Sequence, residues 1–168
     1  MVDPVVARGF LGREYVVKLI IGAGTRHKDG WVHHDIQTLP GIDIICDFWD
    51  LPKNVSEPCS NIEITHVLEH FPMSRTSDTF KLLYDLLAPG GELYIEVPNF
   101  KWHAQMILEN PRDRKIVEYA YGGQLNEWDY HYMGFTPEIL TEELVRAGLQ
   151  VVELSPNSSI ECRAVKRG

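Results

Sequence analysis

Residues 16–25 read VVKLIIGAGT, a short apolar run that ends at two glycines. A continuous apolar run that stops at glycine is typical of a buried strand in a parallel sheet. Glycines after such a strand let the backbone approach a ligand closely, and the amides there can face it. The stretch therefore predicts a strand followed by a ligand-binding turn at Gly22, Ala23 and Gly24.

Further apolar runs and turn signals alternate along the rest of the chain. Strands are predicted at 31–35, 42–46, 62–66 and 92–97, and a terminal antiparallel hairpin at 150–154 and 160–165. Helices are predicted at 74–87, at 100–121 with an interruption at Pro111, and at 136–147. A strand, a helix and a strand of these lengths form a right-handed parallel crossover. The sequence thus predicts a single α/β domain over 1–168, with a mostly parallel sheet of about seven strands.

The composition excludes several partners. The 168 residues include 16 Lys+Arg against 24 Asp+Glu, a net charge of −8, which disfavours binding to nucleic acid. The three cysteines lie far apart, and residues 1–11 are too polar for a signal sequence, which together favour a cytoplasmic protein. No run approaches the roughly 20 apolar residues that span a bilayer, so no membrane partner is expected.

Two acids follow the second and third predicted strands. In open α/β sheets an acid at the end of the second strand accepts hydrogen bonds from ribose hydroxyls, and Asp35 has this place. Asp47 and Phe48 offer a polar acceptor beside a flat apolar face, a pairing that suits adenine. A dinucleotide fingerprint would need a third glycine where His27 stands, and no Walker A lysine is present.

Three further strings carry a family likeness: GWVHHD at 30–35, HVLEHF at 66–71 and LAPGG at 87–91. Together with the glycine turn they resemble the class I S-adenosylmethionine-dependent methyltransferases. The similarity is greatest to small predicted methyltransferases with the motifs GxGT, GWxxxD, VLEH and LxPGG. It runs over 18–100, and more loosely onward through 122–124 and His131. It implies a Rossmann-like methyltransferase sheet and S-adenosylmethionine as cofactor.

The resemblance also implies roles for individual residues. It assigns the backbone of Gly22, Ala23 and Gly24 and the side chain of His66 to the methionine part of the cofactor, Asp35 to the ribose diol, Leu68 to the adenosine, and Asp47 and Phe48 to the adenine. Residues 89–91 would form a structural turn without touching the cofactor.

One departure from the family pattern concerns the spacing of the acids. The intervals from Gly22 to Asp35 and from Asp35 to Asp47 are too short for a strand and a full crossover helix. The helices between strands one and two and between strands two and three are therefore predicted to be shortened or absent. The N-terminal segment or a partner chain, such as the second copy in a homodimer, would then cover that side of the sheet.

Residues 122–135 are rich in aromatic and polar side chains. They are either an irregular loop packed on the core or a lid over the reactive methyl group, in which Gln124, Trp128 and Tyr132 hold the acceptor. His131 is the first candidate for a general base and His70 the second. Methyl transfer can also run on positioning alone, without a base.

The sequence as a whole predicts an S-adenosylmethionine-dependent methyltransferase that acts on an oxygen or nitrogen of a small or polymer-attached acceptor. One alternative is a non-catalytic module, which either binds S-adenosylmethionine or a nucleotide or acts as an interaction module. A remote alternative is a zinc peptidase, because His66-x-x-Glu69-His70 matches HxxEH. That motif needs a long helix, which Pro72 opposes. No metal ligand is otherwise assigned.

Overall fold

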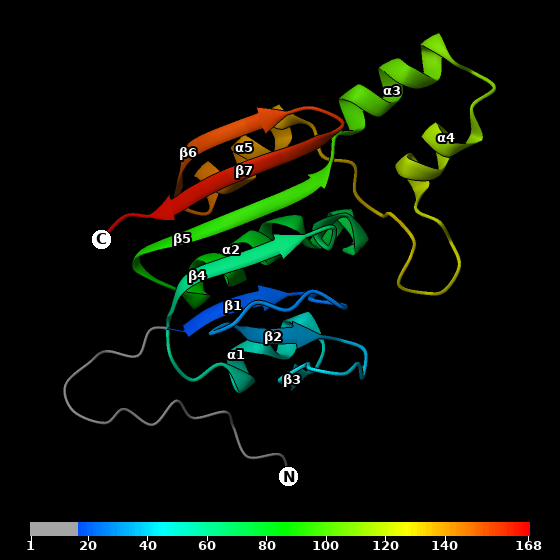
Figure 1. Ribbon diagram of the computed structural model, residues 1–168. Helices are drawn as coiled ribbons and strands as arrows, with labels where there is room; N and C mark the ends of the chain where they lie inside the picture. The colour runs from blue at the N-terminus through cyan, green and yellow to red at the C-terminus, as the bar shows by residue number, and fades with distance from the viewer. Residues whose placement is uncertain (1–16) are drawn as a thin grey trace, which may run out of the picture.

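The computed structural model describes residues 17–168, and a mixed sheet of seven strands forms the framework of that range (Figure 1). The order across the sheet is β3-β2-β1-β4-β5-β7-β6. Neighbouring strands from β1 to β5 pair in parallel, whereas β7 runs antiparallel to both β5 and β6. The strands are β1 (Val17–Ile21), β2 (Val32–Asp35), β3 (Ile44–Ile45), β4 (Cys59–Thr65), β5 (Leu87–Pro98), β6 (Leu149–Pro156) and β7 (Ser159–Lys166). The predicted fold class, including the antiparallel terminal pair, is confirmed.

The longer helices connect the later strands. They are α2 (Thr76–Leu86), α3 (Phe100–Glu109), α4 (Arg114–Tyr121) and α5 (Pro137–Arg146), with a short α1 (Leu51–Asn54) before β4. In Figure 1, α2 and α5 lie behind the sheet, while α3 and α4 extend beyond the end of β5. α5 begins as its sequence predicts, because Thr136 accepts a hydrogen bond from the Ile139 amide and proline occupies the first turn.

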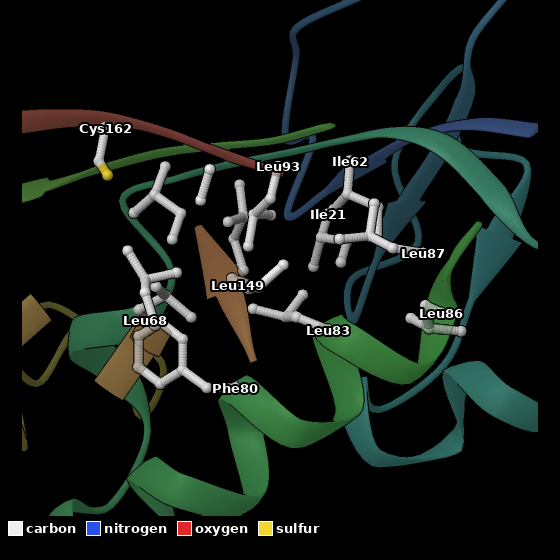
Figure 2. Close-up of a cluster of buried hydrophobic side chains, with 14 of the residues drawn as sticks. Ile21, Ile62, Leu68, Phe80, Leu83, Leu86, Leu87, Leu93, Leu149 and Cys162 are labelled. Atoms are coloured by element: carbon white, nitrogen blue, oxygen red, sulfur yellow. The ribbon is translucent and has the colours of Figure 1, made fainter. Parts of the chain in front are cut away.

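The hydrophobic core lies between the sheet and the helices behind it. Side chains alternate along a strand, so Ile62 and Ile64 of β4 and Leu93 of β5 all reach this side. Phe80 and Leu83 of α2 meet them at a helical spacing (Figure 2). All five side chains are fully buried, so this layer holds most of the sheet in place.

The opposite face of the sheet is polar. Glu63, Tyr94 and Arg163 occupy the alternate positions of β4, β5 and β7. Arg163 Nη1 lies 2.5 Å from Glu92 Oε1, and Lys28 Nζ lies 2.7 Å from Glu63 Oε2. The polar character is limited to β4, β5 and β7, because Ile20 of β1 and His33 of β2 lie on the same face and are buried. Antiparallel pairs such as β5 and β7 can leave one face in water.

The predicted loss of two crossover helices is confirmed. Residues 22–31 and 36–43 contain no helix, although each joins two parallel strands. The expected cover by the N-terminal segment falls on residues 1–16, outside the described residues, and the homodimer stays a prediction. None of the helices between residues 17 and 168 has the length and apolar character that crossing a bilayer demands.

The LAPGG string lies inside β5 instead of before it. Cys59 of β4 pairs with Leu87, and the next paired positions are Asn61 and Glu92, so residues 88–91 bulge out of the ladder. A Cβ on Gly91 would lie 2.8 Å from the Cys59 carbonyl oxygen, which leaves room only for glycine. The string is therefore a structural bulge, in keeping with the turn predicted for it.

Candidate functional site

A cavity of about 390 Å³ lies at the carboxyl ends of β1, β2 and β4. The strand order changes direction here, since the chain moves outward from β1 to β2 and β3 and then returns to β4 on the other side of β1. Open α/β sheets bind their ligands at this switch point. The predicted site residues that line the cavity are Gly22, Asp35, Asp47, Phe48, His66, His70 and Trp128.

A second hollow of about 470 Å³ lies on the polar face of the sheet. It is lined by Glu63, Glu92, Tyr94 and Glu153. These side chains sit along the middle of the strands instead of at their carboxyl ends. The cavity at the switch point is therefore the better candidate for a binding site, although it is the smaller of the two.

Gly22 of the glycine turn forms the floor of the cavity, whereas Gly24 lies outside the lining. Gly22 has a φ of +64°, and a Cβ there would lie 2.2 Å from Val67 Cγ2. The Ala23 amide donates to the His34 carbonyl oxygen at 2.9 Å, which ties the turn to β2. Ala23 itself is buried at 1% exposure and does not line the cavity, so only its backbone contributes to the turn.

Asp35 holds the same turn from the end of β2. Its side chain is buried, and Oδ2 accepts a hydrogen bond from the Gly24 amide at 2.8 Å. Oδ1 accepts from the Gln37 amide at 2.9 Å. Each carboxylate oxygen has two lone-pair sites, so both can accept a further hydrogen bond from the cavity. The sequence predicted a ligand contact here but not this role in shaping the turn.

Asp47 and Phe48 form the far wall. Asp47 Oδ1 accepts from the Trp49 amide at 2.9 Å and caps a 3₁₀ turn, which leaves Oδ2 without a bond in the described part of the chain. The buried Phe48 ring packs against Phe71, with centroids 4.6 Å apart, and against Trp49 at 5.0 Å. The wall thus presents one acceptor beside an aromatic surface.

His34 adds a buried acceptor to the cavity lining. His34 Nε2 lies 3.0 Å from the Cys46 carbonyl oxygen, and because a carbonyl only accepts, Nε2 carries the proton. Nδ1 is then an unprotonated acceptor, and within residues 17–168 it is buried without a partner. Burial lowers the pKa of the His34 ring, which keeps it neutral.

His34 predicts a pH dependence of stability. The folded state lowers the pKa of His34 from 6.5, so the unfolded chain binds this proton first as the pH falls. The contribution of His34 to the free energy of unfolding should be level above about pH 7 and decrease below about pH 6.5, by at most about 1.4 kcal/mol per pH unit. Urea denaturation of the parent and of His34→Gln between pH 7.5 and 5.5 isolates this contribution as the difference between their two slopes, because the other histidines are common to both proteins. His34→Gln should have the shallower fall in stability toward pH 5.5, and His27→Gln, at an exposed histidine, should have the slope of the parent; equal slopes in all three proteins would contradict the assignment.

His66 lies at the end of β4 in a left-handed conformation, with a φ of +54°. Its amide donates to the Glu96 carbonyl oxygen at 2.9 Å, which holds the bend. Its Nδ1 lies 3.3 Å from Glu69 Oε1, and its Nε2 lies 3.4 Å from Glu96 Oε1. The hydrogen bond to Glu69 raises the pKa of His66, which favours the protonated form of this ring.

Two further histidines meet beside the cavity. The rings of His70 and His131 lie 4.9 Å apart in an edge-to-face arrangement. His70 Nδ1 is 3.0 Å from the Tyr130 carbonyl oxygen, and His131 Nδ1 is 3.1 Å from that of Tyr119. Desolvation lowers the pKa of His131, which favours the unprotonated ring that a general base requires.

The segment 122–135 approaches the cavity through only part of its length. Trp128 and its neighbour Glu127 line the cavity, whereas Gln124 and Tyr132 are exposed and lie outside the lining. The Tyr132 amide donates to the Glu69 carbonyl oxygen at 2.8 Å, so this end of the segment is fixed to η2 (Leu68–His70). The roles predicted for Gln124 and Tyr132 in holding an acceptor find no support in this arrangement.

Two sequence-based interpretations of η2 need correction. Leu68 is 2% exposed and packs in the core near Phe80 (Figure 2), so it does not lie along the cavity. The long helix required by a zinc peptidase motif is not formed, because the hydrogen bonding of η2 stops at His70. His66 lies outside the turn with a positive φ, so it cannot share a helical face with His70.

No protein-family model matches the chain, and no curated protein matches its sequence. Solved methyltransferases share its fold. The carbon methyltransferase CurJ is 17% identical with a TM-score of 0.61, and the match covers 91% of this chain and 49% of CurJ. The chain thus spans about half the length of CurJ. An S-adenosylmethionine-dependent methyltransferase from Methanosarcina mazei is 16% identical with a TM-score of 0.59, and the match covers 89% of this chain and 91% of that protein. The N-methyltransferase NodS from Bradyrhizobium japonicum, solved with S-adenosylhomocysteine, is 15% identical with a TM-score of 0.58, over 91% and 79%. The chain therefore has the fold of the class I methyltransferases that its motifs resemble.

Proposed function

We propose that the chain is an S-adenosylmethionine-dependent methyltransferase that acts on an oxygen or nitrogen of a small or polymer-attached acceptor. The observation that carries the proposal is the cavity at the switch point, where Asp35, Asp47 and the Phe48 wall meet above the glycine turn. Its volume of about 390 Å³ is within the usual range of roughly 300–1,000 Å³ for small-molecule sites.

The residues present fit an adenosine. Asp35 keeps one lone-pair site on each oxygen for ribose hydroxyls, and Asp47 Oδ2 can accept from the adenine amino group. Phe48 and Trp49 supply the apolar surface that a purine ring needs.

The charge of the cavity favours a sulfonium over a phosphate. Asp35, Asp47 and Glu127 line it, and its described lining contains no lysine or arginine. Carboxylates attract the positive sulfonium of the cofactor and repel the phosphates of a dinucleotide or ATP. Among the described lining residues, His66 has a raised pKa, so its ring is a candidate partner for the cofactor's own carboxylate in exchange for Glu69 or Glu96. This pattern supports S-adenosylmethionine over a phosphorylated nucleotide.

When bound, the cofactor supplies an electrophilic methyl group for an in-line displacement. The side chains of Trp128 and Glu127 would exclude water from one side of the cavity and orient the acceptor. His131, neutral and in contact with His70, is the proposed base for an acceptor that must lose a proton.

Calorimetry with S-adenosylmethionine, S-adenosylhomocysteine and ATP tests the proposal. The first two should bind and ATP should give no heat, because only ATP brings phosphates into the acidic cavity. Radiolabelled methyl transfer should then be followed with panels of phenols, hydroxy acids, amines and polymer-attached sugars. Absence of heat with both sulfur compounds would refute the cofactor assignment. Binding without transfer to any acceptor would support the non-catalytic module instead.

A further inference from the structure

Glu69, His70 and His131 form a compact cluster beside the cavity. One ligand atom from each side chain lies within 4.8 Å of the other two. The backbone brings them together, because the amides of Tyr132 and Met133 donate to the Glu69 carbonyl oxygen at 2.8 and 3.1 Å. The cluster thus joins two segments that are far apart in the sequence.

Both imidazole rings of the cluster are held in a defined orientation. Carbonyl oxygens accept at Nδ1 of His70 and of His131, so Nδ1 carries the proton in each neutral ring. The free lone pair is then on Nε2 in both cases. A backbone carbonyl on the far nitrogen is the usual support of a histidine that ligates a metal.

Glu69 supplies an unsatisfied buried oxygen to the cluster. The side chain is 2% exposed, and its Oε1 is shared with His66 Nδ1 at 3.3 Å. Within residues 17–168, Oε2 is buried and has no hydrogen-bond partner. A buried carboxylate oxygen without a partner is unfavourable unless a cation or a donor satisfies it.

We propose that Glu69, His70 and His131 bind one divalent transition-metal ion. Two imidazole nitrogens and one carboxylate oxygen suit Zn²⁺ and its neighbours in the first transition row, and do not suit Mg²⁺ or Ca²⁺. Metal–ligand bonds of about 2.1 Å place tetrahedral ligand atoms about 3.4 Å apart. The ligand atoms lie within 4.8 Å of one another, so the side chains have to close in by at most about 1.4 Å. The inference goes beyond the proposed function and does not rest on cofactor binding.

The proposed ion would lie next to the bound acceptor, because His70 also lines the cavity. Three protein ligands leave a zinc coordination position open to an oxygen of an acceptor or a water. A metal lowers the pKa of a hydroxyl that it binds, so it can replace a general base. A nitrogen that ligates the ion cannot take up a proton, so in the metal-bound protein this activation supersedes the base role of His131.

Zinc binding to the full chain tests the site. The protein should be tag-free and treated with chelator, because a polyhistidine tag binds zinc itself. Calorimetry should give one Zn²⁺ per chain, and Co²⁺ should give a visible d–d absorption spectrum. Glu69→Gln and His131→Ala should each weaken zinc binding by about 10–100-fold or more, whereas His27→Ala, at an exposed histidine outside the cluster, should bind as the parent does.

The variants need separate controls, because Glu69 is buried. Circular dichroism and thermal unfolding should establish that each variant folds, and His70→Ala removes a ligand from a less buried position. Absence of zinc binding to the parent, or equal binding by the parent and all three cluster variants, would overturn the proposal. Calorimetry with S-adenosylmethionine on the metal-free protein tests the proposed cofactor site separately. The failure of the zinc site and the failure of the cofactor site can therefore be told apart.

Discussion

Gly22→Ala is expected to abolish detectable cofactor binding and to lower the free energy of unfolding by about 2–4 kcal/mol. Gly22 has a φ of +64°, a conformation that is unfavourable for any residue with a Cβ. The new Cβ would also lie 2.2 Å from Val67 Cγ2, so Val67 or the turn has to move. Either movement distorts the floor of the cavity. Urea denaturation and calorimetry with S-adenosylmethionine measure the two effects.

Gly24→Ala is the matched control for that change. Gly24 has a similar φ of +57°, but no atom would lie within 4 Å of its new Cβ. It should therefore show only the conformational part of the loss, about 1–2 kcal/mol. Val67→Ala combined with Gly22→Ala should recover part of the stability, because it removes the clashing methyl groups. An equal loss in both single glycine variants would rule out the steric explanation.

Asp35→Ala should weaken S-adenosylmethionine binding by about 10–100-fold, since hydrogen bonds to a charged group contribute roughly 1.5–3 kcal/mol. The substitution removes the proposed acceptor for the ribose hydroxyls. It also leaves the amides of Gly24 and Gln37 without their partner, so the thermal midpoint should fall. Calorimetry and thermal unfolding report these two losses separately.

Substitutions of two other acids serve as comparisons for the effect of Asp35→Ala on binding and stability. Asp29→Ala alters an exposed acid on the loop between β1 and β2, outside the cavity, and should change neither quantity. Asp47→Ala should weaken binding by less than Asp35→Ala, because Asp47 is exposed and holds only the Trp49 amide. Unchanged affinity in Asp35→Ala would remove the ribose assignment.

Most of the fold could be predicted because its signals are local. The alternation of Ile62 and Ile64 marks β4, Gly22 ends β1, and Thr136 with Pro137 starts α5. The short intervals between Gly22, Asp35 and Asp47 predicted the missing crossovers by chain length alone. The position of the cavity could be predicted as well, because the carboxyl ends of parallel strands meet at one edge of the sheet.

The remainder depends on contacts between distant segments. In the sheet, β7 lies between β5 and β6. The sequence of each strand by itself does not indicate which strands it pairs with. His103 of α3 is buried at 4% exposure and stacks on Tyr119 of α4, a contact that no local pattern in α3 indicates.

The position of Glu69 depends on such a contact as well. In the sequence Glu69 belongs to the HxxEH string, which is typical of a helical metal motif. In the fold Glu69 lies beside His131, because the amides of Tyr132 and Met133 donate to the Glu69 carbonyl oxygen. Nothing local in either segment indicates this proximity.

Within residues 17–168, no helix covers the polar face of β4, β5 and β7 (Figure 1). Less apolar surface leaves water on folding at a polar face than at an apolar one, and exposure of apolar surface is the main source of the heat-capacity increase on unfolding. A smaller heat-capacity increment flattens the curve of stability against temperature. We therefore expect this part of the described sheet to make the free energy of unfolding vary less steeply with temperature than an apolar, helix-covered face would.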